Sequence, residues 1–171
     1  GNKKPTITQP EAEAALVAAV TFAGKHGVRT ALYPHSHCFI SSAEQALPYV
    51  RKLNRPDFTV LLNLCHEMRA GNANRLADVV EACAPHISAV IISGADATVD
   101  MTSPRAMDRS TLRPLDQGAF DWANLIRLCD AAGVRVPVAF INFKINTNYG
   151  EDYRDYLPRS IAAWRKATHT P

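Results

Sequence analysis

No apolar run in this 171-residue chain reaches the roughly 18 residues that a membrane-spanning helix needs. None of its four cysteines has the CxxC spacing of many zinc and redox sites. The net charge is only +3, and Lys and Arg are scattered rather than striped, which argues against nucleic-acid binding. No signal peptide is visible. We therefore expect a cytoplasmic protein with reduced thiols and with neither a membrane nor a nucleic acid as partner, and a removed signal peptide stays open as an alternative.

The chain does contain enough apolar sequence for one core. Hydrophobic residues make up 47% and charged residues 20%, as in ordinary globular proteins. We expect a single α/β domain over residues 1–171. The predicted strands are 28–33, 58–64, 87–93 and 136–145, and the predicted helices are 8–25, 41–53, 72–85, 120–132 and 152–167.

Three of these strands run into clusters of polar residues. The clusters are Pro34-His35-Ser36-His37, Asn63-Leu64-Cys65-His66 and Ser93-Gly94-Ala95-Asp96. Strands joined by helices are parallel, so the clusters meet at the carboxyl edge of one sheet. Ligands bind at that edge in α/β proteins.

The order α-β-α-β-α-β-α-β-α predicts a parallel sheet with flanking helices, four β/α units in all. Near-continuous apolar strands favour a sheet covered on both faces. An open doubly wound sheet and part of a (β/α)8 barrel both satisfy this order. A complete barrel typically needs about 250 residues, so four strands do not close one. The segment 97–117 is predicted to be a long loop at the active edge, either a functional lid or disordered.

Five runs of the sequence are distinctive: GVRTALYPH, PDFTVLLNLCH, ISAVIISGAD, LRPLDQGAFDW and SIAAWRKA. On these runs the chain resembles the sugar phosphate isomerase/epimerase family, the xylose isomerase-like TIM barrels that include AP endonucleases. The resemblance covers roughly residues 10–167 and implies the C-terminal half of the barrel, strands five to eight. It further implies either a missing N-terminal half or a homodimer in which two halves complete one another.

The resemblance also implies a divalent metal, zinc, manganese or magnesium, at the carboxyl edge. The family's Glu, Asp, His and Glu ligand positions are occupied here by Tyr33, Asn63, Ser93 and Ile141. Only His66 and the nearby Asp96 retain the family pattern. Hard divalent cations prefer charged oxygens, so a metal-assisted reaction is placed in doubt.

His35, His37 and His66 are the alternative metal ligands, because three imidazoles suit zinc with an open fourth position. In the competing interpretation, one His orients the loop and the others contact sugar hydroxyls. Asn63 and Asp96 are able to bind polyol hydroxyls or to close the sheet edge with a buried hydrogen-bond network.

Basic residues follow the third and fourth strands. Arg105, Arg109 and Arg113 in segment 97–117, with Lys144, are able to hold a phosphate or carboxylate, unless the segment is a solvated loop. The full set of predicted site residues is His66, Asn63, His35 and Asp96 as catalytic, and Tyr33, His37, Ser93, Lys144, Asn142 and Arg113 as substrate-binding.

The resemblance implies a small sugar or sugar phosphate as partner and, if the chain is an enzyme, isomerase or epimerase chemistry by 1,2-proton transfer. The alternative is a non-catalytic carbohydrate-binding protein that has lost the metal site. Activity on abasic DNA is disfavoured, because in this family it uses a richer metal cluster.

Overall fold

The computed structural model describes residues 7–168. Its centre is a four-stranded parallel sheet in the order β1-β2-β3-β4. The strands are β1 (Thr30–Leu32), β2 (Phe58–Asn63), β3 (Ile87–Ile92) and β4 (Val138–Phe140). The register pairs Leu32 with Val60, Asn63 with Ile91 and Ile92 with Phe140. The predicted α/β class and the parallel sheet are confirmed.

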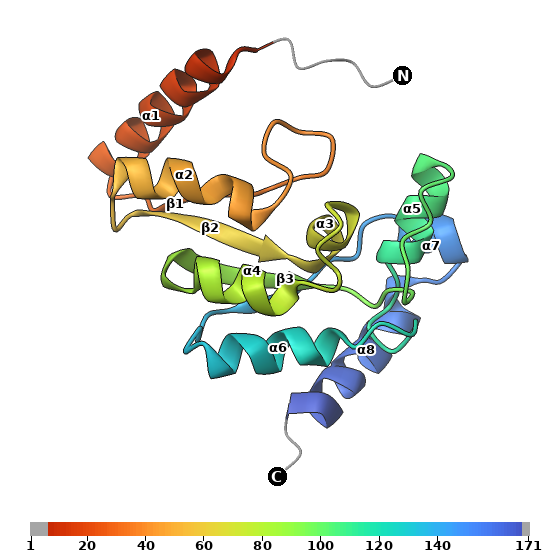
Figure 1. Cartoon of the computed structure of the whole chain (residues 1–171). Helices are drawn as coiled ribbons and strands as arrows, with labels where there is room; N and C mark the ends of the chain where they lie inside the picture. The colour runs from red at the N-terminus through yellow and green to blue at the C-terminus, as the bar shows by residue number, and fades with distance from the viewer. Residues whose placement is uncertain (1–6, 169–171) are drawn as a thin grey trace.

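Three amphipathic helices cover one face of this sheet (Figure 1). They are α2 (Ala43–Leu53), α4 (Leu76–Cys83) and α6 (Trp122–Ala131). The buried residues of α4 are Leu76, Val79, Val80 and Cys83, an i, i+3, i+4, i+7 stripe that forms one apolar face. They pack with the β2 residues Val60 and Leu62 in the main core.

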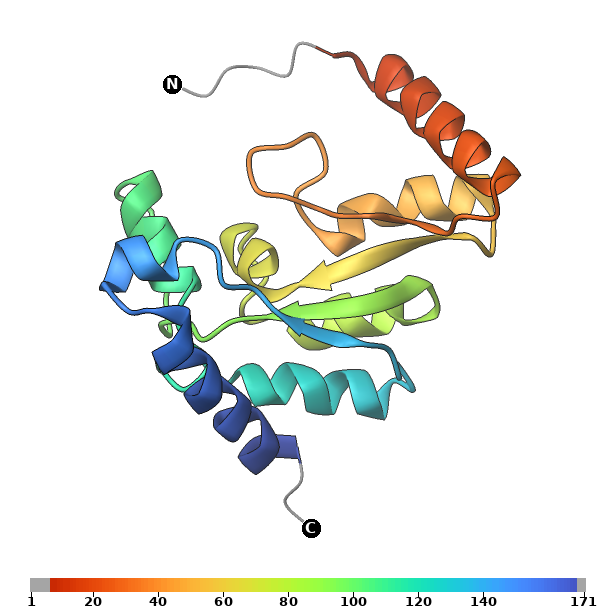
Figure 2. The ribbon, with the colours of Figure 1, turned by 180° about the vertical axis from the view of Figure 1, so that it is seen from behind.

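The opposite face of the sheet is open in the described residues, as Figure 2 shows. Ala31 and Ala139 are exposed on it, and Thr59, Leu61 and Ile91 are partly exposed. Helices therefore cover one face of the sheet in residues 7–168, as in part of a (β/α)8 barrel and not as in an open doubly wound sheet. In a (β/α)8 barrel, the corresponding face of the sheet lines the barrel interior, which is packed with apolar side chains.

Helix α1 (Gln9–Lys25) precedes the sheet and begins with a capping box. The Glu11 carboxylate accepts hydrogen bonds from the Thr8 N–H and the Thr8 hydroxyl, at 2.8 and 2.7 Å. Helix α8 (Tyr153–Thr168) ends the described chain, with Pro158 inside it. None of the helices in residues 7–168 combines length and apolar character sufficient for a membrane span.

Four short helical elements were not expected from the sequence. They are α3 (Leu64–Arg69), the 3-10 turn η1 (Ala84–His86), α5 (Pro104–Thr111) and α7 (Ile145–Tyr149). Helix α5 lies within segment 97–117, so this part of the predicted loop is ordered and contributes buried residues. The predicted fourth strand, 136–145, is shorter than expected, because the chain turns after Phe140 and enters α7.

Candidate functional site

His66 lies at the carboxyl edge of β2, in the first turn of α3. The strand ends at Asn63, whose side-chain oxygen accepts a hydrogen bond from the Cys65 N–H at 3.1 Å and so caps the helix. The expectation that the strand continues through Leu64 is wrong, and Cys65 and His66 are helical. His66 is only 2% exposed.

The imidazole of His66 is held in one tautomer by the main chain. The Ser36 N–H donates to His66 Nδ1 at 3.2 Å, so Nδ1 is an acceptor and the proton of the neutral ring is on Nε2. Nε2 is buried and has no hydrogen-bond partner. Burial, assisted by the neighbouring His35 and Arg69, lowers the pKa of His66 to about 4. At neutral pH His66 therefore presents an unused N–H.

His35 has the opposite tautomer. Its Nδ1 donates to the Ser36 carbonyl oxygen at 2.7 Å, which leaves the lone pair of the neutral ring on Nε2. The centroids of the His35 and His66 rings are 4.1 Å apart. His35 is exposed, whereas His66 is buried. The two neighbouring rings thus offer one base and one hydrogen-bond donor.

Tyr33 and Asn63 form the second half of the cluster. Asn63 Nδ2 donates to Tyr33 Oη at 2.6 Å, and the Tyr33 ring is edge-on to His66 at 5.6 Å. Burial raises the pKa of the Tyr33 phenol, so the hydroxyl keeps its proton near neutral pH. Tyr33 is 40% exposed, and its O–H is available to a ligand on the open face.

A buried ion pair beside His66 was missed by sequence reasoning. Arg69 Nη2 lies 2.9 Å from Asp108 Oδ1, and Arg69 Nε donates to Thr111 Oγ1 at 2.9 Å. The two charged side chains are only 6% and 11% exposed. Arg69 also reaches Ser36 Oγ at 3.5 Å. Nothing local in the sequence links Arg69 on α3 to residues of α5 about forty positions later.

The predicted basic residues converge on the same edge. Lys144 Nζ lies 3.1 Å from Asp108 Oδ2, and Arg113 Nη2 lies 2.7 Å from Asp96 Oδ2. Ser93 is buried, and its hydroxyl donates to the Thr111 carbonyl at 2.8 Å. The structure thus brings Lys144 and Ser93 to α5, and both Asp96 and Arg113 are engaged in an ion pair.

Two other predicted contacts lie further out. His37 is exposed at a backbone φ of 71°, and Asn142 is exposed in the segment that follows β4. Neither has a hydrogen bond in the structure that fixes its side chain to the His35–His66 pair. Their assignment as substrate-binding residues stays a prediction.

Glu67, which the sequence analysis did not identify, is a buried residue that supports the site. Its carboxylate accepts from the Ala43 N–H and from Asn72 Nδ2, both at 2.7 Å, and it is 1% exposed. Ala43 begins α2, directly after the segment that carries His35 and Ser36. Glu67 therefore ties that segment to α3, next to His66.

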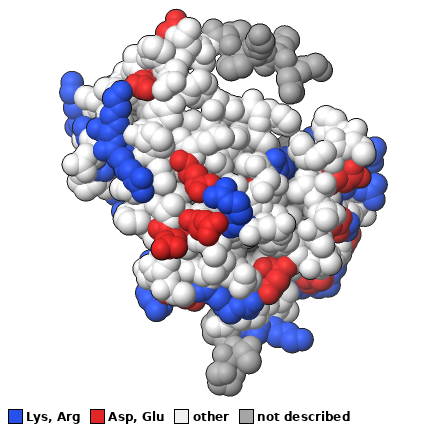
Figure 3. Space-filling view, viewed as in Figure 1, with Lys and Arg blue, Asp and Glu red and all other residues white. Residues whose placement is uncertain are grey.

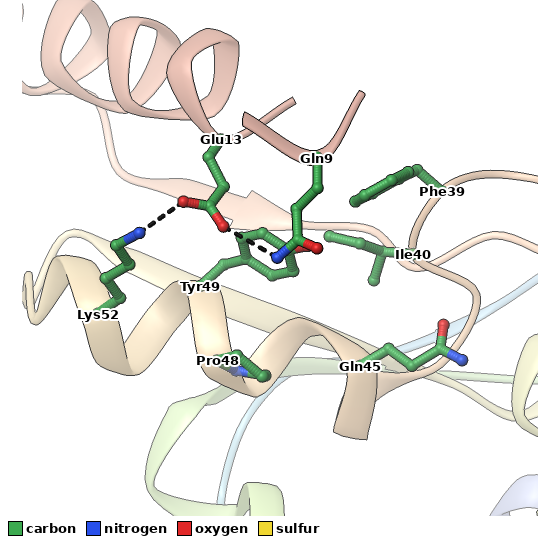
Figure 4. Close-up of a pocket in the computed structure, with 8 residues that line it drawn as sticks. All are labelled: Gln9, Glu13, Phe39, Ile40, Gln45, Pro48, Tyr49 and Lys52. Atoms are coloured by element: carbon green, nitrogen blue, oxygen red, sulfur yellow. Dashed lines mark hydrogen bonds and ion pairs between the residues drawn. The ribbon is translucent and has the colours of Figure 1, made fainter. Parts of the chain in front are cut away.

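A groove between α1 and α2 is separate from the carboxyl edge of the sheet. It has a volume of about 390 Å³, and Glu13 and Lys52 pair across it (Figure 4). Phe39 and Tyr49 form part of its apolar wall. The groove contains none of the residues predicted to carry chemistry.

Charged residues on the helix-covered face are mixed in sign. Figure 3 shows acidic and basic side chains interspersed over α2, α4 and α6. Several of them pair, as Arg75 does with Glu44 at 3.2 Å. The face seen in Figure 3 has no single-sign stripe of the kind that nucleic-acid binding needs.

A family model for xylose isomerase-like TIM barrels matches residues 2–166. The chain belongs to this family. Its resemblance to solved structures gives the same answer for the fold. A xylose isomerase domain-containing protein from Salmonella typhimurium is 17% identical, with a TM-score of 0.72 over 95% of this chain and 60% of that one.

Two further solved structures are similar to the chain to a comparable degree. The IolI protein with a bound zinc atom is 20% identical, with a TM-score of 0.71 over 96% of this chain and 59% of that one. D-allulose 3-epimerase from Methylomonas sp., in complex with D-allulose, is 16% identical, with a TM-score of 0.65 over 96% and 58%. No curated protein matches the chain. The chain therefore spans about 60% of the length of these members, consistent with a partial barrel.

The side chains present do not fit a divalent metal like the zinc of the IolI structure. Among residues 7–168, no three His, Cys, Asp or Glu side chains are grouped so as to hold a metal ion. His66 Nδ1 and Asn63 Oδ1 already accept backbone hydrogen bonds, and the remaining His66 nitrogen carries a proton. The structure brings His35 and His66 together but does not complete the predicted three-histidine site.

Proposed function

We propose that the chain provides part of a sugar isomerase or epimerase site that acts by 1,2-proton transfer on a small polyhydroxylated carbonyl compound. The observation that carries this proposal is the His35–His66 pair, with its two opposite tautomers and a separation of 4.1 Å between ring centroids. Proton transfer next to a carbonyl needs a base for the proton and a donor for the developing oxyanion. One pair supplies both.

In this proposal His35 Nε2 removes the proton from the carbon beside the carbonyl. His66 Nε2–H donates to the carbonyl oxygen and stabilises the enediolate that forms. A neutral imidazole is suited to this role, because its proton is shared with the oxyanion and is not lost to it. His35 then returns the proton to the neighbouring carbon, and the hydroxyl proton of that carbon passes to the former carbonyl oxygen, which completes an isomerisation. An epimerisation would need a second acid that protonates the opposite face of the enediolate.

Tyr33 and Asn63 would position the substrate. The Tyr33 hydroxyl accepts from Asn63, so its own proton is directed to another acceptor, such as a sugar hydroxyl. Asp96 was predicted as a catalytic residue, and its carboxylate is engaged in an ion pair with Arg113. No step of this mechanism passes through a metal ion.

The test is proton exchange, because it needs neither turnover nor product identification. D-allulose and D-fructose would be incubated with the 171-residue chain in deuterium oxide, and deuterium at the carbon beside the carbonyl would be followed by NMR. We expect incorporation in the unchanged chain and its loss in His35→Ala and in His66→Ala, with incorporation unaffected by a chelator.

His86→Ala is the matched control, since His86 lies in η1, ahead of β3, and not in the cluster at the carboxyl edge. Deuterium incorporation that persists in a folded His35→Ala protein would remove His35 from the mechanism. Incorporation abolished by the chelator would reinstate a metal.

A non-catalytic sugar-binding function is the second candidate, and the carboxylates favour it. Asp96, Asp108 and Glu67 are all held by other groups, so none of them is free to act as a base. If D-allulose binds by calorimetry and no deuterium enters it, the chain is a binding protein.

A further inference from the structure

Tyr149 on α7 lies against two arginines of the α5 region. The Arg109 and Arg113 guanidinium carbons are 5.6 and 5.2 Å from the centre of its ring. Its hydroxyl donates to the Arg109 carbonyl oxygen. Two cations thus share one aromatic ring at the carboxyl edge, beyond the His35–His66 pair.

Two buried N–H donors in this region have no acceptor. They are Arg113 Nε and Asn148 Nδ2, the latter on the residue before Tyr149. Arg113 uses Nη2 on Asp96 and leaves Nε unpaired. Each of them is a donor that an acceptor on a bound ligand would satisfy.

The local charge favours an acidic acceptor. Arg69, Arg109, Arg113 and Lys144 carry four positive charges, and within residues 7–168 the carboxylates paired with them are Asp96 and Asp108. An excess of two positive charges remains. A planar guanidinium with a free Nε–H is the group that best binds a carboxylate or phosphate in two-point fashion.

We propose that Arg109, Arg113 and Asn148 form a subsite for an anionic group, a phosphate or a carboxylate, with Tyr149 covering it in the absence of ligand. This deepens the proposed function, on which it rests, by making the substrate an acidic sugar derivative. The anion replaces the Tyr149 ring over the two guanidinium groups and accepts from the two unpaired donors. Helix α7, which carries Tyr149, is only five residues long and contacts α5.

A chain of contacts connects the subsite to the His35–His66 pair. Lys144 and Arg69 share Asp108, and Arg69 reaches Ser36, whose N–H fixes the His66 tautomer. An anion at this end of the site would leave the rest of a small sugar free to extend toward His35 and His66.

Inorganic phosphate is the probe for the first experiment. It would be titrated into the 171-residue chain, and the ¹⁵N–¹H signals of the arginine Nε groups would be followed by NMR. We expect a saturable shift of the Arg113 Nε signal. Binding should weaken about tenfold in Arg113→Gln and also in Arg113→Lys, which keeps the charge and loses the fork.

Arg105→Gln is the matched control, since Arg105 is exposed on α5 one turn before Arg109. It removes one positive charge, as Arg113→Gln does, and phosphate affinity should change by less than about twofold. Equal losses in Arg105→Gln and Arg113→Gln, or a wild-type shift that never saturates, would overturn the subsite.

Competition then distinguishes the source of the anion. A sugar phosphate that displaces inorganic phosphate more strongly than an aldonic acid assigns a phosphate, and the reverse order assigns a carboxylate. The subsite and the proposed function fail independently. Arg113-dependent phosphate binding without any deuterium exchange refutes only the proton transfer, and exchange into a neutral ketose without phosphate binding refutes only the subsite.

Discussion

The Ser36 N–H donates to His66 Nδ1 across 3.2 Å, from the segment after β1 to the first turn of α3. This hydrogen bond fixes the imidazole as an Nε2–H donor and makes protonation unfavourable, because a second proton on Nδ1 would oppose the Ser36 N–H. The neutral state of His66 is therefore a property of the fold as well as of burial.

The pH dependence of stability should reveal this histidine. Burial lowers the pKa of His66 from 6.5 to about 4, so the folded state binds fewer protons than the unfolded state between these values. The contribution of His66 to stability is complete above pH 6.5 and falls as the pH falls toward 4. In His66→Gln that contribution is absent, and the melting temperature should fall less steeply over this range.

Melting temperatures of both proteins at pH 7.5, 6, 5 and 4.5 would check this. The comparison between the two chains cancels the carboxylates that titrate in the same range. Parallel melting curves for the two chains would mean that His66 does not titrate as the burial predicts.

Removing one partner of the Arg69–Asp108 pair should be costly. Asp108→Asn leaves the guanidinium of Arg69 buried without its charge partner, and we expect a loss of about 3 kcal/mol in unfolding free energy. The matched control is Asp121→Asn, whose pair with Arg127 is more than half exposed and should contribute less than about 1 kcal/mol. Urea denaturation measures both, and equal losses would contradict the prediction.

Glu67 should matter for both stability and the site. Glu67→Gln replaces one accepting oxygen by an NH2 donor, which then faces the donor of Ala43 N–H or of Asn72 Nδ2. We expect the free energy of unfolding to fall by about 2 kcal/mol. Glu44→Gln, on the exposed pair with Arg75, is the control and should cost under about 1 kcal/mol.

The Glu67→Gln chain should also show a changed environment for His35 and His66, since Ala43 anchors the segment that carries Ser36. Histidine ring signals in NMR would report it. Unchanged signals in a destabilised protein would limit Glu67 to a purely structural role.

Gly118 should tolerate no side chain. Its φ is +91°, and a Cβ would lie 2.1 Å from the Ala95 carbonyl oxygen, directly beside Asp96. Gly133 has a similar φ of +74° with nothing within 4 Å, so Gly133→Ala should cost only the backbone strain, about 1 kcal/mol. Gly118→Ala should lower the free energy of unfolding, measured by urea denaturation, clearly more than Gly133→Ala does. Equal losses would contradict the close approach of Gly118 to the Ala95 carbonyl.

Local patterns alone predicted most of the fold. Near-continuous apolar runs, alternating with helical segments, predicted the α/β class and all four strands. These signals are read over a few neighbouring residues, which is why they appear in the sequence. The same reasoning placed His35, Asn63, His66 and Asp96 at one edge, because parallel strands bring their carboxyl ends together.

The chemistry of that edge was decided only by the tertiary structure. Whether His66 is a donor or a base depends on the Ser36 N–H thirty residues away, and whether Asp108 is free depends on Arg69 and Lys144. The helix α3, which turns His66 away from the strand direction, depends on a cap made by Asn63. Sequence determines which groups are available, and only folding determines which of them are already paired, since pairing is a property of distances between residues far apart in the chain.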